Sequence, residues 1–485
     1  MQVLSRAAAV AMVGLLVACT AEPTPSASGD REGRSMVIAT VVAPASLNPL
    51  DGYAPYGAAK IYDGLVELQP GGTTRPVLAA APPVPSADGR SWTVSLRDDV
   101  YFHDKAKFGA ADVIATYQGV LAGGLKSRFW MLAAVHQLDA KTVRFDLSQP
   151  APGFAALLVL GIKRAGTVST GTGPYLVENW QPGRSLVLKA NPDYRQGAPA
   201  ITKVTVEFVP DDEIRAQRLR DGKLDGADLP ARLAGSFQNS SAFTIVRHDA
   251  ADVRMVTLPA SSPVTADASV RLALNLCVDR QALVDAALAG RGKPTSLPLP
   301  TVLAEFIEPG ARFEFDVPRA NAVLDMAGWV PGPDGVRRKS GVVAEFDVAY
   351  PVADIADREL VGGFARAAAA IGVKVTPRPT ARAALAGATA ELTAVGDPLD
   401  PGRALSWLGD RTAAAAAVTD PAQRAVAFRA VQRAYLDEPS SVVLAQADHS
   451  YVIRQNWTGY QPVVDATGTD HTWGAWWNLQ TWAPR

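Results

Sequence analysis

The sequence has few cysteines and histidines and no excess of either charge. Two cysteines among 485 residues cannot build a disulfide framework. The five histidines never stand four residues apart as in a zinc-binding helix, and there is no Cys-x-x-Cys, so we predict no metal site. Forty-seven Lys and Arg residues against 48 Asp and Glu residues leave a net charge of -1, which gives a nucleic-acid partner no electrostatic support.

Motifs that carry catalysis are also missing. Residues 290–295 contain a Gly-Lys pair without the spacing of a phosphate-binding loop, and Gly171-Thr172-Gly173 is not followed by a third glycine at the dinucleotide-binding spacing. No Gly-x-Ser-x-Gly turn occurs. The sequence therefore predicts a protein that is not an enzyme and holds no cofactor.

The one apolar run near membrane length lies at the start of the chain. Arg6 precedes an apolar stretch over residues 7–17, which is too short for a finished membrane helix and typical of a secretory signal. Its end, Leu16 to Cys19, resembles the lipobox of bacterial lipoproteins, which implies cleavage after residue 18 and a lipid on Cys19. An ordinary signal peptide that is cut after Ala18 without lipidation is the alternative.

Residues 19–35 are rich in proline, serine, glycine and charge, and we predict that they form a flexible tether. The remaining 450 or so residues exceed what one hydrophobic core usually supports, which favours two or more lobes. Cys277 then has no disulfide partner, and it lies in an apolar stretch of helical length over residues 268–289. We predict a buried, unreactive thiol there.

Alternating and helical patterns predict a mixed α/β body. Strands are expected over residues 92–96, 143–147, 204–208 and 346–350. Helices are expected over residues 211–222, 318–328 and 420–438, because acidic residues or proline open them and glycine or proline ends each of them. Residues 342–375 fit a βαβ unit, with another short strand over residues 392–395.

Several ordered stretches resemble the extracellular solute-binding proteins of family 5, the peptide and nickel binders of ABC importers. The matching stretches, in family order, are Ile61-Tyr62-Asp63-Gly64-Leu65, Arg97 to Asp104, Gly171 to Tyr175, Asn191 to Tyr194, Val209 to Asp212, Val270 to Leu274 with Asp279-Arg280, and Ala327-Gly328-Trp329. Each match is weak alone, but the ordered set is specific.

The resemblance implies an α/β, two-lobed fold like that of the periplasmic binding proteins (type II, similar to cluster C), with a hinge that the chain crosses twice. The implied organisation is a signal peptide (1–18), a lipidated tether (19–35), lobe I (36–258), lobe II (259–448) and a C-terminal return to lobe I (449–485). We expect the tryptophans of this return to pack in the core of lobe I.

Gly396-Asp397-Pro398-Leu399-Asp400-Pro401 resembles the "GDxxDP" loop of the peptide binders, whose first aspartate pairs with the ammonium of the peptide. The match makes Asp397 the candidate ligand residue, and a carboxylate in a closed cleft suits a buried ammonium. The alternative is that Asp397 only caps a turn. Arg358 is the candidate for the peptide carboxylate by its position after a strand, and a solvated surface arginine is the alternative.

The resemblance implies a monomeric lipoprotein on the outer face of the cytoplasmic membrane that captures di- or oligopeptides and delivers them to ABC permease subunits. Two alternatives remain open. One is a nickel chelate or another small solute as ligand. The other is a lipoprotein that keeps the fold and regulates cell-envelope assembly, because the second lobe is short and rich in alanine and departs from the family pattern.

Overall fold

The computed structural model describes residues 34–123, 125–126, 128–167, 170–381, 390–468 and 470–485. The predicted signal peptide, Cys19 and all of the predicted tether except its last two residues lie outside this part of the chain. Within it, no helix combines the length and the apolar character needed to cross a bilayer.

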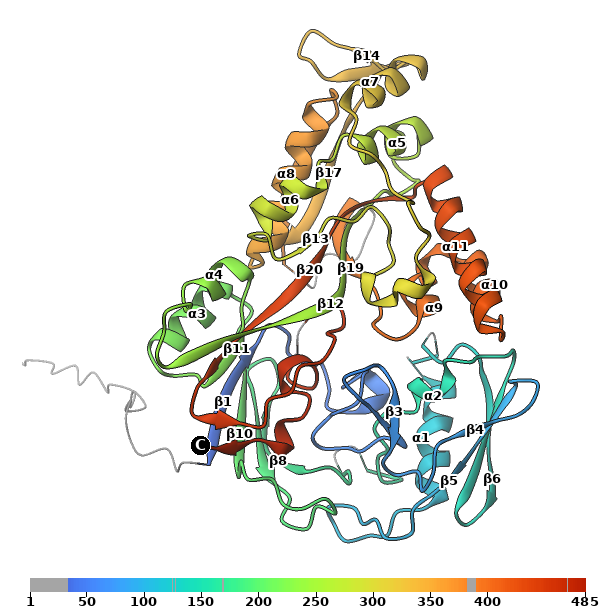
Figure 1. Ribbon diagram of the computed structural model, residues 1–485, viewed down its shortest axis with the longest axis vertical. Coiled ribbons are helices and arrows are strands. Elements are labelled where there is room, and N and C mark those ends of the chain that lie inside the picture. Colours follow the sequence, from blue (N-terminus) through green and yellow to red (C-terminus); the bar gives the residue numbers. More distant parts are fainter. Residues whose placement is uncertain (1–33, 124, 127, 168–169, 382–389, 469) are drawn as a thin grey trace, which may run out of the picture. The chain divides into compact units, whose positions relative to one another are not determined.

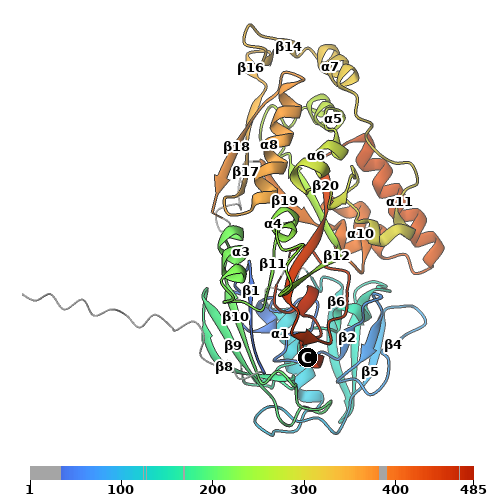
Figure 2. The same ribbon diagram turned by 60° about the vertical axis from the view of Figure 1, so that its left-hand side comes forward.

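Two long strands organise the main sheet. β12 (Phe243–Thr257) and β20 (Ser441–Arg454) pair antiparallel along most of their length and lie side by side in Figures 1 and 2. On the side of β20 the sheet continues through β11 (Gly226–Asp228), β1 (Ser35–Thr40), β10 (Lys203–Phe208), β9 (Ser185–Ala190) and β8 (Tyr175–Gln181). On the side of β12 it continues through β19 (Ala390–Val395), β17 (Glu345–Pro351) and β18 (Lys374–Thr380).

The cores divide along these two strands. Phe243 near the start of β12 and Val452 near the end of β20 belong to a core with residues between 39 and 237. Val253 and Ala447, farther along the same strands, belong to a core whose members all lie between 253 and 447. Each long strand therefore enters both lobes, and the chain crosses from one lobe to the other twice, as the resemblance implied.

The predicted strands and helices are found close to their expected bounds. The strands are β5 (Ser91–Ser95), β7 (Thr142–Leu147), β10 and β17, and the helices are α3 (Asp212–Arg220), α7 (Val317–Met326) and α11 (Pro421–Asp437). Each helix is capped by an aspartate whose carboxylate accepts a backbone N–H: Asp211, Asp316 and Asp420. The βαβ unit is also confirmed, because α8 (Ile355–Ala369) connects β17 to the parallel strand β18.

The apolar stretch over residues 268–289 forms two helices, α5 (Ala268–Leu276) and α6 (Arg280–Ala287). The break occurs because the Asp279 carboxylate accepts the N–H of Ala282 and starts a new helix. The Arg280 guanidinium is buried and donates to the carbonyls of Val443 and Asn275. The Asp279-Arg280 pair therefore fixes a helix junction against β20.

The remaining elements build the outer parts of the molecule. A four-stranded sheet has the order β4 (Val84–Pro85), β5, β7 and β6 (Leu132–Asp139), and α1 (Ala110–Ala122) contacts β6 and β7. The other elements are β2 (Val66–Leu68), β3 (Thr74–Pro76), α2 (Phe154–Leu157), α4 (Ala231–Gly235), β13 (Gly292–Lys293), β14 (Val330–Pro331), β15 (Arg337–Lys339), β16 (Val342–Val343), α9 (Pro401–Ala404), α10 (Asp410–Ala416), β21 (Trp457–Thr458) and β22 (Ala483–Pro484). Short 3₁₀ turns cover Pro49–Asp51, Thr301–Phe306, Ser406–Leu408, Gly474–Trp476 and Leu479–Thr481.

The C-terminal segment returns to the first lobe and is rich in buried tryptophan. Trp473 and Trp477 pack with core residues between 65 and 162, whereas Trp476 and Trp482 pack with core residues between 36 and 208. All four side chains are buried, as expected for core rather than surface aromatics.

Candidate ligand site between the lobes

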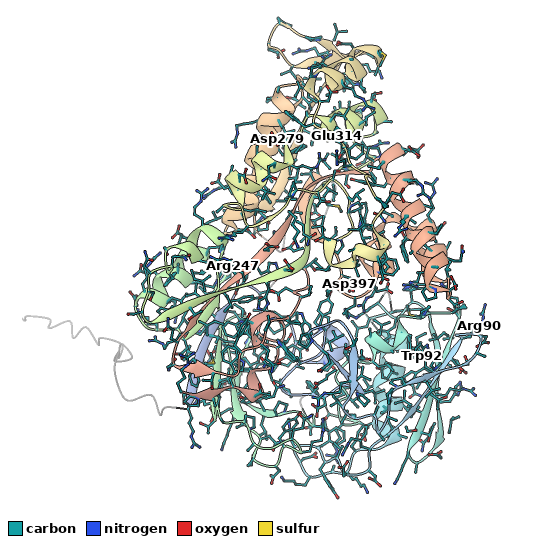
Figure 3. All side chains as sticks on the ribbon, viewed as in Figure 1. Arg90, Trp92, Arg247, Asp279, Glu314 and Asp397 are labelled. Carbon is teal, nitrogen blue, oxygen red and sulfur yellow. The ribbon has the colours of Figure 1, made fainter. Side chains whose placement is uncertain are left out.

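The loop after β19 positions Asp397. At Gly396 the backbone has φ +137°, and a β-carbon there would lie 2.1 Å from the carbonyl oxygen of Ala251 on β12. Glycine is therefore required for the loop to pack this closely against the hinge strand. Asp397 follows directly and is 3% exposed. Figure 3 labels it between the helices that follow β19 and the elements of the first lobe.

The two oxygens of Asp397 have different surroundings. Oδ1 accepts the backbone N–H groups of Leu399 and Asp400, both at 2.9 Å, and Nη2 of Arg403 at 2.8 Å. Within the part of the chain that the structure describes, Oδ2 accepts only a long 3.3 Å bond, from the hydroxyl of Tyr56 in the first lobe. Asp397 thus caps its own turn and also faces a side chain from the other lobe.

Two arginines face this carboxylate. Arg128 places its guanidinium carbon 5.4 Å from the centre of the Tyr56 ring and donates to the carbonyl of Pro55. Burial, and then the charge of Arg403, lower the pKa of Arg128. Burial also disfavours the charge on Arg403, but the carboxylates of Asp397 and Asp400 outweigh it and raise the pKa of Arg403.

The positive charge of this group exceeds its negative charge. Asp400 is paired with Arg424 at 2.6 Å and Asp397 with Arg403 at 2.8 Å, and Arg128 has no ion pair among the described residues. Nε and Nη1 of Arg403 are buried and have no hydrogen-bond partner among the described residues. Buried donors without partners cost free energy, so this group is suited to receive an acceptor.

Two cavities lie between the two lobes. One, of about 470 Å³, is lined by Trp130, Phe154 and Leu157 of the first lobe and by Arg403, Ala413 and Ala416 after β19. The other, of about 340 Å³, is lined by Val41 and Asp212 on one side and by Arg254, Asp357 and Leu392 on the other. Each has walls from both lobes, as a ligand cleft requires.

No contact among the described residues connects Arg358 to Asp397. It lies in the first turn of α8, its side chain is 55% exposed, and its ion pair is with Glu359 at 3.5 Å. Its neighbours Ala356 and Asp357 line the smaller cavity. Sequence reasoning did not single out Tyr56, Arg128 or Arg403; the only signal for Arg403 was its place six residues after Asp397, at the start of a helix.

Two histidines that are isolated in the sequence meet at the hinge. His248 on β12 and His449 on β20 place their Nδ1 atoms 2.7 and 2.9 Å from the two carboxylate oxygens of Asp465. The hydroxyl of Tyr451 donates to the same carboxylate at 2.5 Å. Although burial opposes ionisation, the two histidines lower the pKa of Asp465. No spacing in the sequence predicts this cluster.

The cluster continues into the second lobe. Nε2 of His449 lies 2.9 Å from Asp252, whose carboxylate also accepts two 2.7 Å bonds from Arg254. Arg254 in turn donates to Asp357 in the first turn of α8, at 2.5 Å. The chain Asp465–His449–Asp252–Arg254–Asp357, called the hinge network below, joins the C-terminal segment to a wall of the smaller cavity.

Three of the motifs that resemble the family pack together in the first lobe. Buried Asp63 accepts hydrogen bonds from Thr172 at 3.0 Å and Tyr194 at 3.2 Å, and burial raises the pKa of Asp63 to about 6. A β-carbon on Gly171 would lie 2.1 Å from the carbonyl oxygen of Ile61. Three separated motifs therefore pack together away from the Asp397 loop.

Cys277 is buried and unpaired, and burial raises the pKa of its thiol to about 12. This agrees with the predicted unreactive thiol. Within the described ranges, no three His, Cys, Asp or Glu side chains are grouped so that they could hold a metal ion.

Two lobes joined by shared strands, with cavities walled by both, define a two-lobed solute-binding protein. A family model for bacterial extracellular solute-binding proteins, family 5 Middle, matches residues 73–397. The chain belongs to this family. Protein XP55 of Streptomyces lividans is 36% identical over 502 residues, which cover 94% of this chain and 91% of that protein.

Other known proteins agree on the fold. The structure of NikZ from Campylobacter jejuni in complex with Ni(L-His) has a TM-score of 0.85 at 23% identity and covers 93% of this chain and 99% of its own. The structure of AppA from Bacillus subtilis in complex with a nonapeptide has a TM-score of 0.81 at 19% identity, with the same coverage of both chains. The nickel-binding periplasmic protein of Escherichia coli (strain K12) is 26% identical over 348 residues, which cover 64% of this chain and 65% of that protein.

These findings confirm the two-lobed fold and the family. The family consists of extracytoplasmic solute-binding proteins of ABC importers that bind peptides or nickel chelates, and the chain is not an enzyme.

Proposed function

We propose that this protein captures small peptides outside the cell and delivers them to the permease subunits of an ABC importer. The observation that carries the proposal is the buried carboxylate of Asp397, which stands on a hinge-packed loop and faces Tyr56 of the other lobe. A carboxylate in such a position can neutralise the terminal ammonium of a peptide, whose burial would otherwise be costly.

Oδ2 of Asp397 keeps acceptor capacity for that ammonium. A carboxylate offers about four lone-pair sites on its two oxygens, and here three donors use Oδ1 while Oδ2 has one long bond. The three hydrogen bonds to Oδ1 already fix the orientation of the Asp397 carboxylate. Binding of an ammonium to Oδ2 therefore costs little further side-chain conformational freedom. We keep Arg358 as the candidate for a more distant carboxylate of a longer peptide.

The proposal includes lobes over residues 36–258 and 259–448, although β12 already enters the core of the second lobe at Val253. Residues 449–485 return to the first lobe, and the protein is a monomer that works by hinge closure. A peptide that contacts both lobes favours the closed state, because only that state provides all of its contacts.

Binding should be visible as stabilisation. We expect at least one class of di- to pentapeptide to raise the melting temperature of the purified protein, because a ligand at 100 times its dissociation constant stabilises the fold by about 2.7 kcal/mol. Calorimetry with nickel plus free histidine is the parallel assay. Stabilisation by the nickel mixture alone, with no response to any peptide, would replace peptide by metal chelate as the ligand.

Asp397→Asn should weaken peptide binding by roughly 10- to 100-fold, since a hydrogen bond to a charged group contributes about 1.5–3 kcal/mol. The matched control is Asp437→Asn, because Asp437 is an exposed aspartate near the end of α11. Titration calorimetry of both variants against the same peptide measures the difference. Equal affinities for the two variants would show that Asp397 only caps its turn.

We further propose that Cys19 carries the lipid that holds the protein on the outer face of the cytoplasmic membrane. Cys19→Ser should move the protein from the membrane fraction to the medium in cells, because a two-chain anchor is needed for stable attachment. Labelling with a fatty-acid analogue should mark the wild-type chain and not the variant. An unlabelled wild-type chain would favour an ordinary cleaved signal peptide.

A further inference from the structure

Two helix ends of the second lobe meet charged side chains of the first lobe beside the smaller cavity. Oδ2 of Asp212 accepts the backbone N–H of Ile355, the first residue of α8, at 3.1 Å. Nη2 of Arg232 in α4 donates to the carbonyl of Ala286, in the last turn of α6, at 3.0 Å. In both Figures 1 and 2, α3 and α4 lie next to α8 and α6.

We propose that these two hydrogen bonds, called the rim latch below, hold a fraction of the molecules closed in the absence of solute. Asp212 and Arg232 would then bias the hinge, whereas Asp397 is the candidate ligand residue. This role rests on the hinge closure of the proposed function and on no particular solute.

The charges of the rim latch suit the helix ends that they meet. A helix has a partial positive charge at its N-terminus and a partial negative charge at its C-terminus. The Asp212 carboxylate meets the N-terminus of α8, and the Arg232 guanidinium meets the C-terminus of α6. Hydrogen bonds to charged groups are also stronger than those between neutral groups. Both contacts therefore favour the closed state.

Asp212 is held in position within the first lobe. Its Oδ1 accepts Nη2 of Arg215 at 2.6 Å, and the side chain of Arg215 is 1% exposed. Arg215 also donates to the backbone carbonyls of Val209 and Asp228. Because the carboxylate is already oriented, its bond to Ile355 costs little further conformational freedom. Val209 to Asp212 is one of the stretches that resemble the family, and the rim latch gives its last residue a role in closure.

The N–H of Ile355 lies at the first position of α8, where the helix itself provides no acceptor. Asp354 caps α8 by accepting a different N–H, that of Asp357, at 2.9 Å. When the lobes separate, water must therefore replace the Asp212 carboxylate at Ile355. Asp357 also accepts a bond from Arg254, so the rim latch meets the hinge network in the first turn of α8.

The test removes the donor in one lobe and the acceptor in the other. Ile355→Pro removes the N–H, and the position suits proline, because Asp354 is extended and α11 of this chain also begins with an aspartate cap followed by proline. Ile355→Val keeps the N–H and is the matched control. Asp212→Ala removes the acceptor, and its control is Glu213→Ala at the exposed next position.

The separation of the lobes is measured by pulsed electron paramagnetic resonance in protein refolded from denaturant, which removes any bound solute. Gln217→Cys on α3 and Arg366→Cys on α8 carry the spin labels at exposed positions. The background is Cys19→Ser, in which the remaining Cys277 is buried. Burial raises the pKa of Asp212 to about 6, so measurements at pH 8 keep its carboxylate ionised. Thermal unfolding checks the fold of each variant.

We expect the wild-type chain to show two lobe separations, one closed and one open. Ile355→Pro and Asp212→Ala should each lower the ratio of closed to open molecules about 10-fold, as for the loss of a hydrogen bond to a charged group. Ile355→Val and Glu213→Ala should stay within about twofold of the wild type. Because both substitutions break the same bond, the double variant should match either single variant.

Three results would overturn the rim latch. The first is a wild-type chain with only the open separation, because no closed molecules would then exist without solute. The second is a closed population that neither Ile355→Pro nor Asp212→Ala reduces. The third is an equal loss in Ile355→Pro and Ile355→Val, since the side chain rather than the N–H would then make the contact. Peptide binding is measured separately, so a failed rim latch leaves the peptide proposal standing, and a chain that binds no peptide can still show the expected loss of closure.

Discussion

Asp465→Asn is expected to destabilise the protein by about 3–5 kcal/mol, the usual cost of removing one partner from a buried ion pair. Asp465 is 1% exposed, and its two oxygens serve His248, His449 and Tyr451. An amide keeps the shape but supplies one acceptor instead of two and turns an N–H group toward a donor. Both the urea midpoint and the melting temperature of the variant should be lower than those of the wild type.

Asp63→Asn is the control, because Asp63 is also buried and its hydrogen-bond partners are the neutral hydroxyls of Thr172 and Tyr194. Burial raises the pKa of Asp63, so its charge at neutral pH is a cost that the amide removes. We expect this variant to lose about 1–3 kcal/mol, less than Asp465→Asn, because the amide leaves one of the two hydroxyl donors without its acceptor. Equal losses in both variants would mean that shape, and not charge pairing, explains the role of Asp465.

Where the sequence predicted an element of the fold, it did so through local signals, because the causes of these elements are local. Asp211, Asp316 and Asp420 begin helices through their own carboxylates, and alternation marks the strands that have one buried face. The apolar pattern did not predict the break between α5 and α6. The periodic apolar pattern runs through residues 268–289, and only the capping role of Asp279 interrupts it.

The site was less predictable, because its parts come from distant segments. The family loop indicated Asp397, but no local pattern connects it to Tyr56, which lies 341 residues away. Arg403 lies two residues beyond the quoted loop, and its two buried donors without partners among the described residues are evident only in the packed structure. His248 and His449 looked like isolated side chains for the same reason.

The hinge network gives these distant contacts a mechanical consequence. His449 and Asp252 lie where β20 and β12 pass between the two cores, and β12 has a register shift between His248 and Asp252 at that point. Arg254 and Asp357 carry the network to a wall of the smaller cavity. A solute in that cavity therefore contacts groups that are bonded, through charged pairs, to the strands that form the hinge.

The His449 imidazole should make the stability of the protein fall in alkaline solution. Burial alone would lower the pKa of His449, but its hydrogen bonds to Asp252 and Asp465 outweigh burial and raise the pKa to about 10. A histidine is near 6.5 in an unfolded chain. Its stabilising contribution is therefore complete below about pH 6.5 and is lost as the pH rises toward about 10, a loss on the order of a few kcal/mol.

His449→Gln isolates this contribution, because Gln has no charge to lose. The variant should be less stable than the wild type by about 3–5 kcal/mol at pH 7, since two buried carboxylates lose their cation. The difference should shrink steadily between pH 7 and pH 10.5 in urea titrations. The comparison must be between the two proteins, because burial lowers the pKa of Lys60 to about 7, and this residue adds stability over the same rise in pH. A difference that stays constant across the range would show that His449 is not charged in the fold, and that the hinge strands are held together by neutral hydrogen bonds.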